Sequence, residues 1–186
     1  MRKLLPQFCL FFGLCMVCIS SFADEASAGN EPQLSAESSA TWSSTVQEVM
    51  LSAISLSGIK YKYGGVTPET GFDCSGFVRY VFQQAANLTL PHGARALSQL
   101  GQTVAQDNLQ PGDLVFFNTL KSSFSHVGIY LGNNRFIHSP SPGQSVSIMS
   151  MNDSYWSKRF NGARRITSSQ SGTLSIKELT QPTPAE

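Results

Sequence analysis

The chain has 186 residues, of which 41% are hydrophobic and 13% are charged, and its formal net charge is +1. This composition is typical of one globular domain with polar flanks, and it excludes a protein that binds nucleic acid through bulk positive charge. Arg2 and Lys3 belong to the N-terminal segment described next. The rest of the chain carries eleven basic and twelve acidic residues, so it is nearly neutral.

The first 23 residues have the pattern of a secretory signal peptide. Basic residues at positions 2 and 3 precede an apolar run at residues 8–19, which is too short to span a bilayer comfortably. Ser21 and Ala23 supply the small side chains of a cleavage site. We therefore expect export to the periplasm, the cell envelope or the medium, with no stable membrane insertion after cleavage. An uncleaved N-terminal anchor is the alternative.

Export changes what the cysteines can do. Cys9, Cys15 and Cys18 leave with the signal peptide, and the residue before each is larger than a lipidation site accepts, which disfavours a lipoprotein. Cys74 then remains, and a lone thiol in an oxidising compartment cannot staple the fold. It is either buried and inert or kept for its reactivity.

Helices are expected in the N-terminal half. Residues 24–40 are polar and predict a flexible leader. From residue 41 to 56 apolar side chains recur at helical spacing, which predicts a helix of about four turns that Gly58 ends. A second helix is predicted to open at Asp73 or Cys74, and a short third one at residues 94–100.

After Gly101 the pattern is that of β-strands. Strands are expected at residues 113–117, 126–131, 135–139, 146–149 and 162–166, with a hairpin turn at residues 132–134. Helices before strands predict an α+β fold, in which N-terminal helices pack on one face of a C-terminal antiparallel sheet or half-barrel. The predicted domain covers residues 41–167, and residues 168–186 read as a disordered tail.

Cys74 is expected at the N-terminus of the second helix. There the helix dipole and free backbone N–H groups favour an anion, so the thiol is expected to shift towards thiolate. Its neighbours Asp73, Ser75 and Gly76 are small or polar, and the apolar face of the helix begins only at Phe77. This setting favours a nucleophile over a cysteine kept for burial.

A nucleophilic cysteine needs a base and a group that orients the base. The chain has three histidines, His92, His126 and His138. Gly132, in the predicted hairpin turn, is midway in the sequence between His126 and His138. The two histidines would therefore be direct cross-strand neighbours if the loop holds an odd number of residues. A two-residue loop without a bulge would place them on opposite faces. The alternative is two unrelated strand histidines.

A zinc site is a further alternative. Cys74 and the three histidines have the right ligand types, but no two of them have the short spacing typical of zinc ligands. We therefore expect no metal and no other cofactor.

Five segments, in this order, carry a resemblance to a known family. They are Tyr61-Lys62-Tyr63-Gly64-Gly65, Phe72-Asp73-Cys74-Ser75-Gly76-Phe77-Val78, Gly112-Asp113-Leu114-Val115-Phe116-Phe117, His126-Val127-Gly128-Ile129-Tyr130 and Phe136-Ile137-His138. Over residues 58–166 the chain resembles the NlpC family of papain-like cell-wall peptidases. The resemblance implies a papain-like fold. It also implies hydrolysis of amide bonds in peptidoglycan stem peptides or crosslinks, through a thiolate nucleophile and an acyl-enzyme.

The resemblance also implies roles for single residues. Cys74 matches the nucleophile, His126 the base, His138 the residue that orients the base, and Tyr61 a tyrosine near the oxyanion site. Asp73 and Ser75 are expected to contact polar groups of the substrate.

One segment departs from the family pattern. Relatives often carry Leu-Pro-Arg followed by a hydroxyl residue, where this chain has Leu90-Pro91-His92-Gly93. His92 and Arg95 are candidates for lining the substrate groove, and a surface histidine that caps a short helix is the alternative reading.

Two other functions use the same fold. A non-catalytic peptidoglycan-binding module would normally lack the nucleophile or the base, whereas all three positions are occupied here. An amidase or acyltransferase would use the same cysteine, histidine and polar residue. The expected partner is a peptidoglycan peptide as substrate, and the sequence leaves the question of protein partners open.

Overall fold

The computed structural model describes residues 33–120 and 122–167, so the predicted signal peptide, most of the predicted leader and the predicted tail lie outside the described residues. The helices are α1 (Gln33–Ser55), α2 (Cys74–Ala86), α3 (Ala94–Leu97) and α4 (Ser154–Ser157), with a short 3₁₀ helix at Gln106–Asn108. The strands are β1 (Val66–Thr67), β2 (Gly71–Phe72), β3 (Gln102–Val104), β4 (Leu114–Phe117), β5 (His126–Gly132), β6 (Arg135–His138), β7 (Ser147–Ser150) and β8 (Phe160–Arg165). None of the helices in these ranges is long and apolar enough to cross a membrane.

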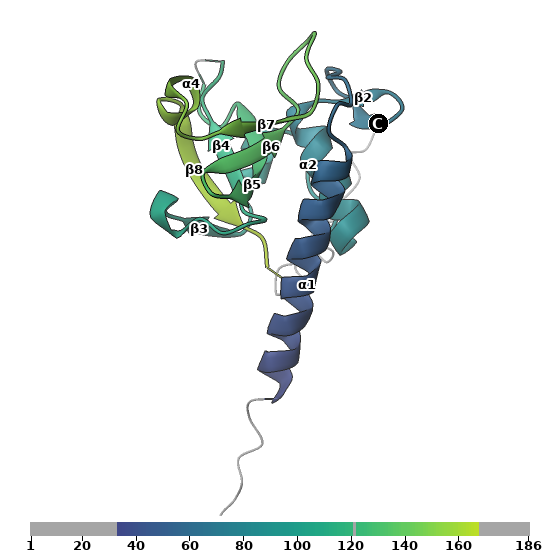
Figure 1. Ribbon diagram of the computed structural model, residues 1–186, viewed down its shortest axis with the longest axis vertical. Coiled ribbons are helices and arrows are strands. Elements are labelled where there is room, and N and C mark those ends of the chain that lie inside the picture. Colours follow the sequence, from purple (N-terminus) through teal and green to yellow (C-terminus); the bar gives the residue numbers. More distant parts are fainter. Residues whose placement is uncertain (1–32, 121, 168–186) are drawn as a thin grey trace, which may run out of the picture. The chain divides into compact units, whose positions relative to one another are not determined.

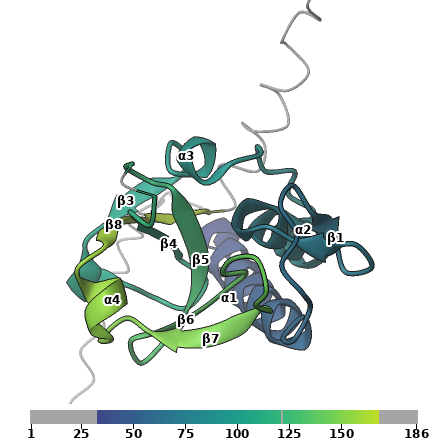
Figure 2. The ribbon, with the colours of Figure 1, turned by 90° about the horizontal axis from the view of Figure 1, so that it is seen from above.

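Six strands form one antiparallel sheet in the order β3-β8-β4-β5-β6-β7, and β1 and β2 form a separate small pair. Figures 1 and 2 show α1 and α2 side by side on one face of this curved sheet, with α4 on the other. The predicted α+β fold, with helices on one face of a C-terminal antiparallel sheet, is thus confirmed.

The core has two parts, one on each face of the sheet. Leu114 and Phe116 of β4 face the cluster that includes α1 and α2, whereas Val115 and Phe117 face a second cluster that includes Trp156. All four are fully buried, which explains why β4 is apolar at every position instead of alternating. The second cluster is mainly aromatic, and it surrounds the residues discussed below.

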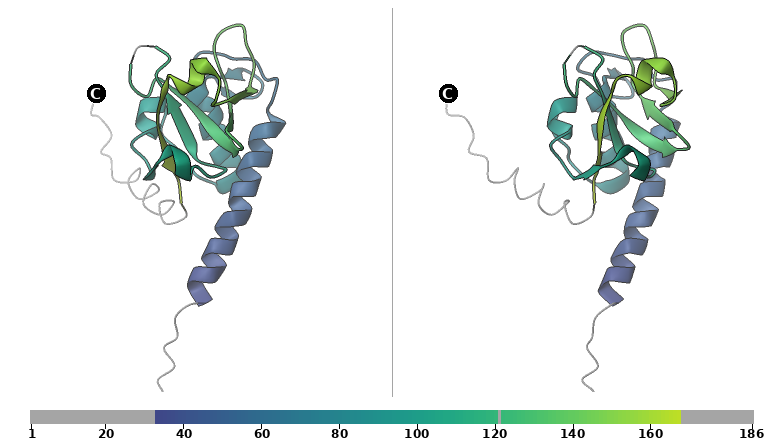
Figure 3. Two further views of the ribbon diagram at one scale, coloured as in Figure 1. Left: turned by 60° about the vertical axis from the view of Figure 1, so that its left-hand side comes forward. Right: turned by 90° about the vertical axis from the view of Figure 1, so that its left-hand side faces the viewer.

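Helix α1 begins at Gln33, earlier than the sequence pattern predicts. Residues 33–40 lack an apolar period, but they are rich in residues that tolerate a helix, such as Ala, Gln and Glu. Val49 and Ala53, in the C-terminal half of the helix, are buried. Its N-terminal part runs on past the sheet in both views of Figure 3.

The hairpin of β5 and β6 differs from the prediction in one informative way. Its loop is the pair Asn133 and Asn134, both with left-handed φ angles (51° and 54°), which is a two-residue turn. The register shifts between Tyr130 and Gly132, so Leu131 is an extra residue in a bulge. Without the bulge the side chains of His126 and His138 would lie on opposite faces of the sheet.

As a result His126 and His138 share a face but are not directly opposed. Ile129 pairs with Ile137, so His138 faces Gly128, and His126 is the diagonal neighbour of His138. The predicted direct pairing is therefore wrong, and the predicted common face is right. A two-residue loop alone would place the two histidines on opposite faces, and the one extra residue of the bulge brings them back to the same face.

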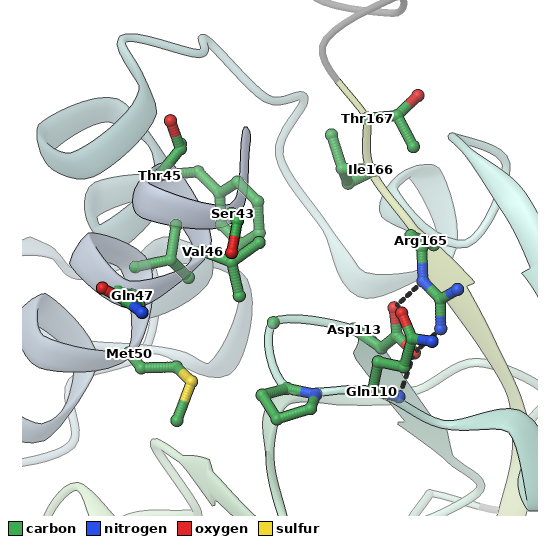
Figure 4. Close-up of a pocket in the computed structure, with 14 residues that line it drawn as sticks. Ser43, Thr45, Val46, Gln47, Met50, Gln110, Asp113, Arg165, Ile166 and Thr167 are labelled. Carbon is green, nitrogen blue, oxygen red and sulfur yellow. Dashed lines mark hydrogen bonds and ion pairs between the residues drawn. The ribbon is translucent and has the colours of Figure 1, made fainter. Parts of the chain in front are cut away.

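A cavity of about 490 Å³ lies between α1, the turn before β4 and the end of β8. Figure 4 shows Val46 and Met50 of α1 on one wall and Asp113, Gln110 and Arg165 on the other. The Asp113 carboxylate is almost fully buried, and it accepts from Nε and one terminal nitrogen of Arg165 and from the backbone N–H of Gln110, each at 2.8 Å. These bonds tie the turn before β4 to the last strand.

Candidate active site

Cys74 is the first residue of α2, as the sequence predicts. Asp73 is the N-cap, and its Oδ1 accepts from the backbone N–H of Gly76 at 2.6 Å and from the Ser75 hydroxyl at 2.9 Å. An aspartate here satisfies free N–H groups of the first turn. The cap therefore fixes the backbone that carries the thiol.

The Gly64-Gly65 loop is clamped to the same turn. The other carboxylate oxygen of Asp73 accepts from the N–H of Gly64 at 3.1 Å, and the carbonyl of Gly65 accepts from the N–H of Asp73 at 3.0 Å. A Cβ on Gly76 would lie 2.0 Å from that carbonyl oxygen, so the approach requires glycine. The clamp explains why the Gly-Gly and Asp-Cys-Ser-Gly motifs occur together, and it brings Tyr61 to the thiol.

His126 and His138 are joined by a hydrogen bond. Nε2 of His126 and Nδ1 of His138 are 2.7 Å apart, and both side chains are buried. Gly128 makes this possible, because a Cβ there would lie 3.2 Å from that of His138 and 2.9 Å from the carbonyl oxygen of Ile137. The bond uses Nε2 of His126 and leaves its Nδ1 free for other chemistry.

A pocket of about 590 Å³ has both the predicted nucleophile and the predicted base in its lining. Cys74, His126 and Tyr61 all line it, as does Trp156. The rest of the lining comes from the loop after β4, the loop between β6 and β7, strand β7 itself and the start of α4. It comprises Thr119, Leu120, Ser125, Pro140, Ser141, Pro142, Gln144, Met149, Asp153 and Tyr155. Cys74 therefore borders this pocket, which is called the groove below.

The thiol is not poised as a thiolate in the resting site. Burial raises the pKa of Cys74 to about 11, and the charge of Asp73 adds to this. The backbone N–H groups of Val127, Ser75 and Cys74 itself act in the opposite direction, but their effect is smaller. The helix N-terminus thus favours the anion as expected, yet burial outweighs it, which corrects the expected shift towards thiolate.

Both histidines are neutral at physiological pH. Burial lowers the pKa of His126 to about 4. Burial and the neighbouring His126 lower the pKa of His138 to about 3. Burial also raises the pKa of Tyr61, with smaller contributions from Cys74 and Asp73, so its hydroxyl keeps its proton and can donate. The resting site therefore pairs a neutral thiol with a neutral imidazole.

Other predicted site residues lie in different surroundings. Ser75 is buried, and its hydroxyl and the Asp73 carboxylate are bonded to each other, which gives both a structural part. His92 and Arg95 are exposed and are not among the residues that line the groove. Contact of these four residues with substrate stays a prediction. No group of three or more His, Cys, Asp or Glu that could hold a metal ion occurs within residues 33–120 and 122–167.

Two residues of the site were not predicted. Trp156 packs against both histidines, with ring centroids 5.7 Å from His126 and 4.9 Å from His138. Ser139 is fully buried, and its hydroxyl donates to the carbonyl of Phe72 at 2.7 Å, which ties the end of β6 to the segment before the nucleophile. Ser139 follows His138 directly, but a serine there gives no signal in the sequence. Trp156 lies in the segment between the strands predicted at residues 146–149 and 162–166. A large aromatic residue in such a polar connecting segment is the one sequence feature that indicates a buried position there.

Comparisons with known proteins agree with this geometry. The NlpC/P60 family matches residues 58–165. The chain is 46% identical over 111 residues to the murein DD-endopeptidase MepS/murein LD-carboxypeptidase of Escherichia coli K12, a match that covers 60% of this chain and 57% of that protein. It is 47% identical over 109 residues to the gamma-DL-glutamyl hydrolase of Bacillus subtilis 168, covering 58% of this chain and 26% of that protein.

A solved structure shows the same fold. An NlpC/P60 family protein from Bacillus cereus ATCC 10987 superposes with a TM-score of 0.61 at 33% identity, covering 64% of this chain and 39% of that one. The chain thus spans only about a quarter to about three fifths of the length of these relatives. The family match includes Cys74, His126 and His138, the residues that the pocket and the hairpin bring together. The chain belongs to the NlpC/P60 family.

Proposed function

We propose that this protein is an exported cysteine peptidase that hydrolyses amide bonds in peptidoglycan stem peptides or crosslinks. One observation carries the proposal: Cys74 at a helix N-terminus shares a groove with His126, whose far nitrogen is hydrogen-bonded to His138. This is the geometry of a nucleophile, a base and an orienting residue. The names of the relatives, which include murein endopeptidases, supply the substrate class.

The proposed reaction begins from the neutral pair. Nδ1 of His126 takes the proton of Cys74 as the sulfur attacks the scissile carbonyl, so thiolate and imidazolium form during the attack. This order follows from the raised pKa of Cys74 and the lowered pKa of His126, which disfavour a preformed ion pair. His126 then gives the proton to the leaving amine, and water hydrolyses the thioester.

The oxyanion needs donors that are in place beforehand. The backbone N–H of Cys74 and the hydroxyl of Tyr61 are the proposed donors, each contributing about 3 kcal/mol to stabilising the transition state. Tyr61 lines the groove, and its raised pKa keeps the hydroxyl protonated. His138 holds the tautomer of His126 through the 2.7 Å bond.

Export is part of the proposal and rests on the pattern of residues 1–23. A peptidoglycan substrate lies outside the cytoplasmic membrane, which agrees with that pattern. Sequencing the N-terminus of the protein recovered from the envelope fraction tests this part, and a mature chain that begins at Asp24 is expected.

The enzymatic proposal is tested by digesting purified peptidoglycan and defined muropeptides. Wild-type protein is expected to release stem-peptide fragments that mass spectrometry identifies, and Cys74→Ala is expected to release none. Undiminished digestion by Cys74→Ala would refute the assigned nucleophile. Release of intact stem peptides from the glycan would instead indicate an amidase. Binding without cleavage by the wild type would indicate a binding module.

A further inference from the structure

The nucleophile and the two histidines belong to opposite faces of the sheet. Cys74 packs against the core cluster that includes α1 and α2. His126 and His138 instead pack against Trp156, which belongs to the second cluster. Pairing between β5 and β6 fixes the histidines relative to each other, but it does not fix the thiol relative to them. The distance between thiol and imidazole therefore depends on bonds that join the two sides.

Ser139 makes one such bond. It directly follows His138, and its hydroxyl donates to the carbonyl oxygen of Phe72 at 2.7 Å. Successive side chains of a strand point to opposite faces. Accordingly His138 faces His126, whereas Ser139, one residue past β6, faces the segment before α2. Ser139 is at 0% exposure, so water does not compete for its hydroxyl.

The carbonyl that Ser139 binds belongs to the peptide group that joins Phe72 to Asp73. The same carbonyl accepts from the N–H of Lys62 at 2.9 Å, and the N–H of this peptide group donates to the carbonyl of Gly65 at 3.0 Å. Two of the three bonds thus hold the peptide group to the loop before β1, and the bond from Ser139 holds it to the end of β6. This peptide group lies one residue before the nucleophile, so its position is passed directly to the thiol.

A second bond joins the same two parts of the molecule at the other histidine. The backbone N–H of Val127, which directly follows His126, is hydrogen-bonded to the Cys74 thiol. Each histidine is therefore followed by a residue that binds the segment of the nucleophile. Sulfur is a weak acceptor and a backbone carbonyl is a strong one. Ser139 therefore supplies the stronger of the two attachments.

We propose that Ser139 is a positioning residue, whose hydroxyl holds the peptide group before Cys74 against the end of β6 and thereby sets the distance between the thiol and the His126 imidazole. Ser139 does not line the groove and is separate from the three residues of the proposed triad. The thiol and the imidazole are both neutral in the resting site, so no ion-pair attraction draws them together. The effect on hydrolysis rests on the proposed peptidase function, whereas the effect on thiol reactivity does not.

Alkylation of Cys74 by iodoacetamide tests the proposal without peptidoglycan, because the thiol must lose its proton to His126 as it reacts. Ser139→Ala removes the hydroxyl, while the carbonyl of Phe72 keeps the N–H of Lys62 and is not left unpaired. This variant is expected to fold. At neutral pH it should react about two- to tenfold more slowly than the wild type, the factor that corresponds to the net strength of one neutral hydrogen bond. Mass spectrometry of the Cys74 peptide gives the rate.

A double-mutant cycle with His126→Ala shows whether Ser139 acts through the imidazole. His126→Ala alone should react slowly, and the addition of Ser139→Ala should slow the reaction no further. Equal slowing in both backgrounds would overturn the proposal, because the hydroxyl would then act on the thiol without the base. A folded Ser139→Ala that reacts at the wild-type rate would also overturn it.

Ser98→Ala is the matched control. Ser98 is likewise at 0% exposure, and its hydroxyl donates to the carbonyl of Arg95 at 2.8 Å, but it lies at the end of α3 and does not line the groove. This control should keep the wild-type alkylation rate, and equal slowing of the control would contradict the proposal. If Ser139→Ala does not fold where Ser98→Ala does, the hydroxyl serves the whole fold and the proposal is wrong.

Digestion of defined muropeptides supplies the kinetic readout. Ser139→Ala should lower kcat by the same factor as the alkylation rate and leave KM nearly unchanged, because Ser139 lies outside the groove. A raised KM with unchanged kcat would overturn the proposal. A wild type that cleaves no muropeptide would refute the peptidase function, and the alkylation cycle would still decide the part played by Ser139.

Discussion

The substitution Asp73→Asn separates the effect of the Asp73 charge on the pKa of Cys74 from the effect of burial. The carboxylate raises the pKa of Cys74 through its negative charge, although burial is the larger cause. The variant removes the charge and leaves the burial. We therefore expect the pKa of Cys74 to fall below about 11 but to stay above the ordinary value of 9.0.

The size of the effect on reactivity can be worked out. Each unit by which the thiol pKa falls gives tenfold more thiolate, but the thiolate becomes less nucleophilic, so the net gain with a disulfide reagent is about threefold. A fall of one unit therefore gives about threefold faster modification of Cys74 at mildly alkaline pH, and any fall of less than two units gives less than about tenfold. The assay is modification by a small aromatic disulfide, followed at the Cys74 peptide by mass spectrometry.

The same variant should lose some stability. Asparagine keeps an oxygen for the bonds from Gly76 and Ser75, but its amide nitrogen cannot accept from the N–H of Gly64, which the carboxylate does at 3.1 Å. Leaving that donor unpaired costs about 1–3 kcal/mol, measurable by urea unfolding. Glu69→Gln is the control, because Glu69 is exposed and does not affect the pKa of Cys74. An unchanged rate in folded Asp73→Asn, or a thiol pKa below 9, would refute the reasoning.

Three further predictions concern the base, the buried ion pair and the hairpin. Because the pKa of His126 is lowered to about 4, kcat/KM should rise with pH to half its maximum near pH 4, and a half-maximum near 6.5 in initial-rate measurements would contradict this. Asp113→Ala leaves Arg165, which is 27% exposed, without its partner and should cost about 3 kcal/mol in urea unfolding; a loss under about 1 kcal/mol would mean that the pair contributes little. Gly128→Ala places a Cβ against His138 and should lower both kcat and, by about 1–3 kcal/mol, the free energy of unfolding; wild-type kcat would show that the strands adjust freely.

Much of the fold was predictable because local patterns and tertiary structure agree. The start of α2 at Cys74, the strands β4 to β8 and their hairpin all follow from apolar periodicity and turn residues. The short elements β1, β2, β3 and α4 were not predicted. Each has two to four residues, so it shows no period, and tertiary contacts rather than sequence pattern determine it.

The site was predictable in its residue types and only partly in its chemistry. Cys74, His126 and His138 could be selected from the motifs and the hairpin count. The bulge at Leu131, by contrast, depends on backbone geometry that a residue count does not reveal. The pKa of Cys74 also could not be read from its helix position, because burial in the folded chain raises it by more than the N–H groups of the helix N-terminus lower it.

The bulged turn has a consequence for how this protein can change during evolution. The loop residues Gly132, Asn133 and Asn134 do not line the groove, so their side chains could be replaced where the left-handed angles allow. Their number could not, because one inserted or deleted residue would swing His138 to the α2 face of the sheet, away from His126. Length variation in this hairpin is therefore restricted to even steps or to changes that remove the bulge at the same time. The length of a loop outside the groove is thus constrained as strictly as the identity of the proposed catalytic residues.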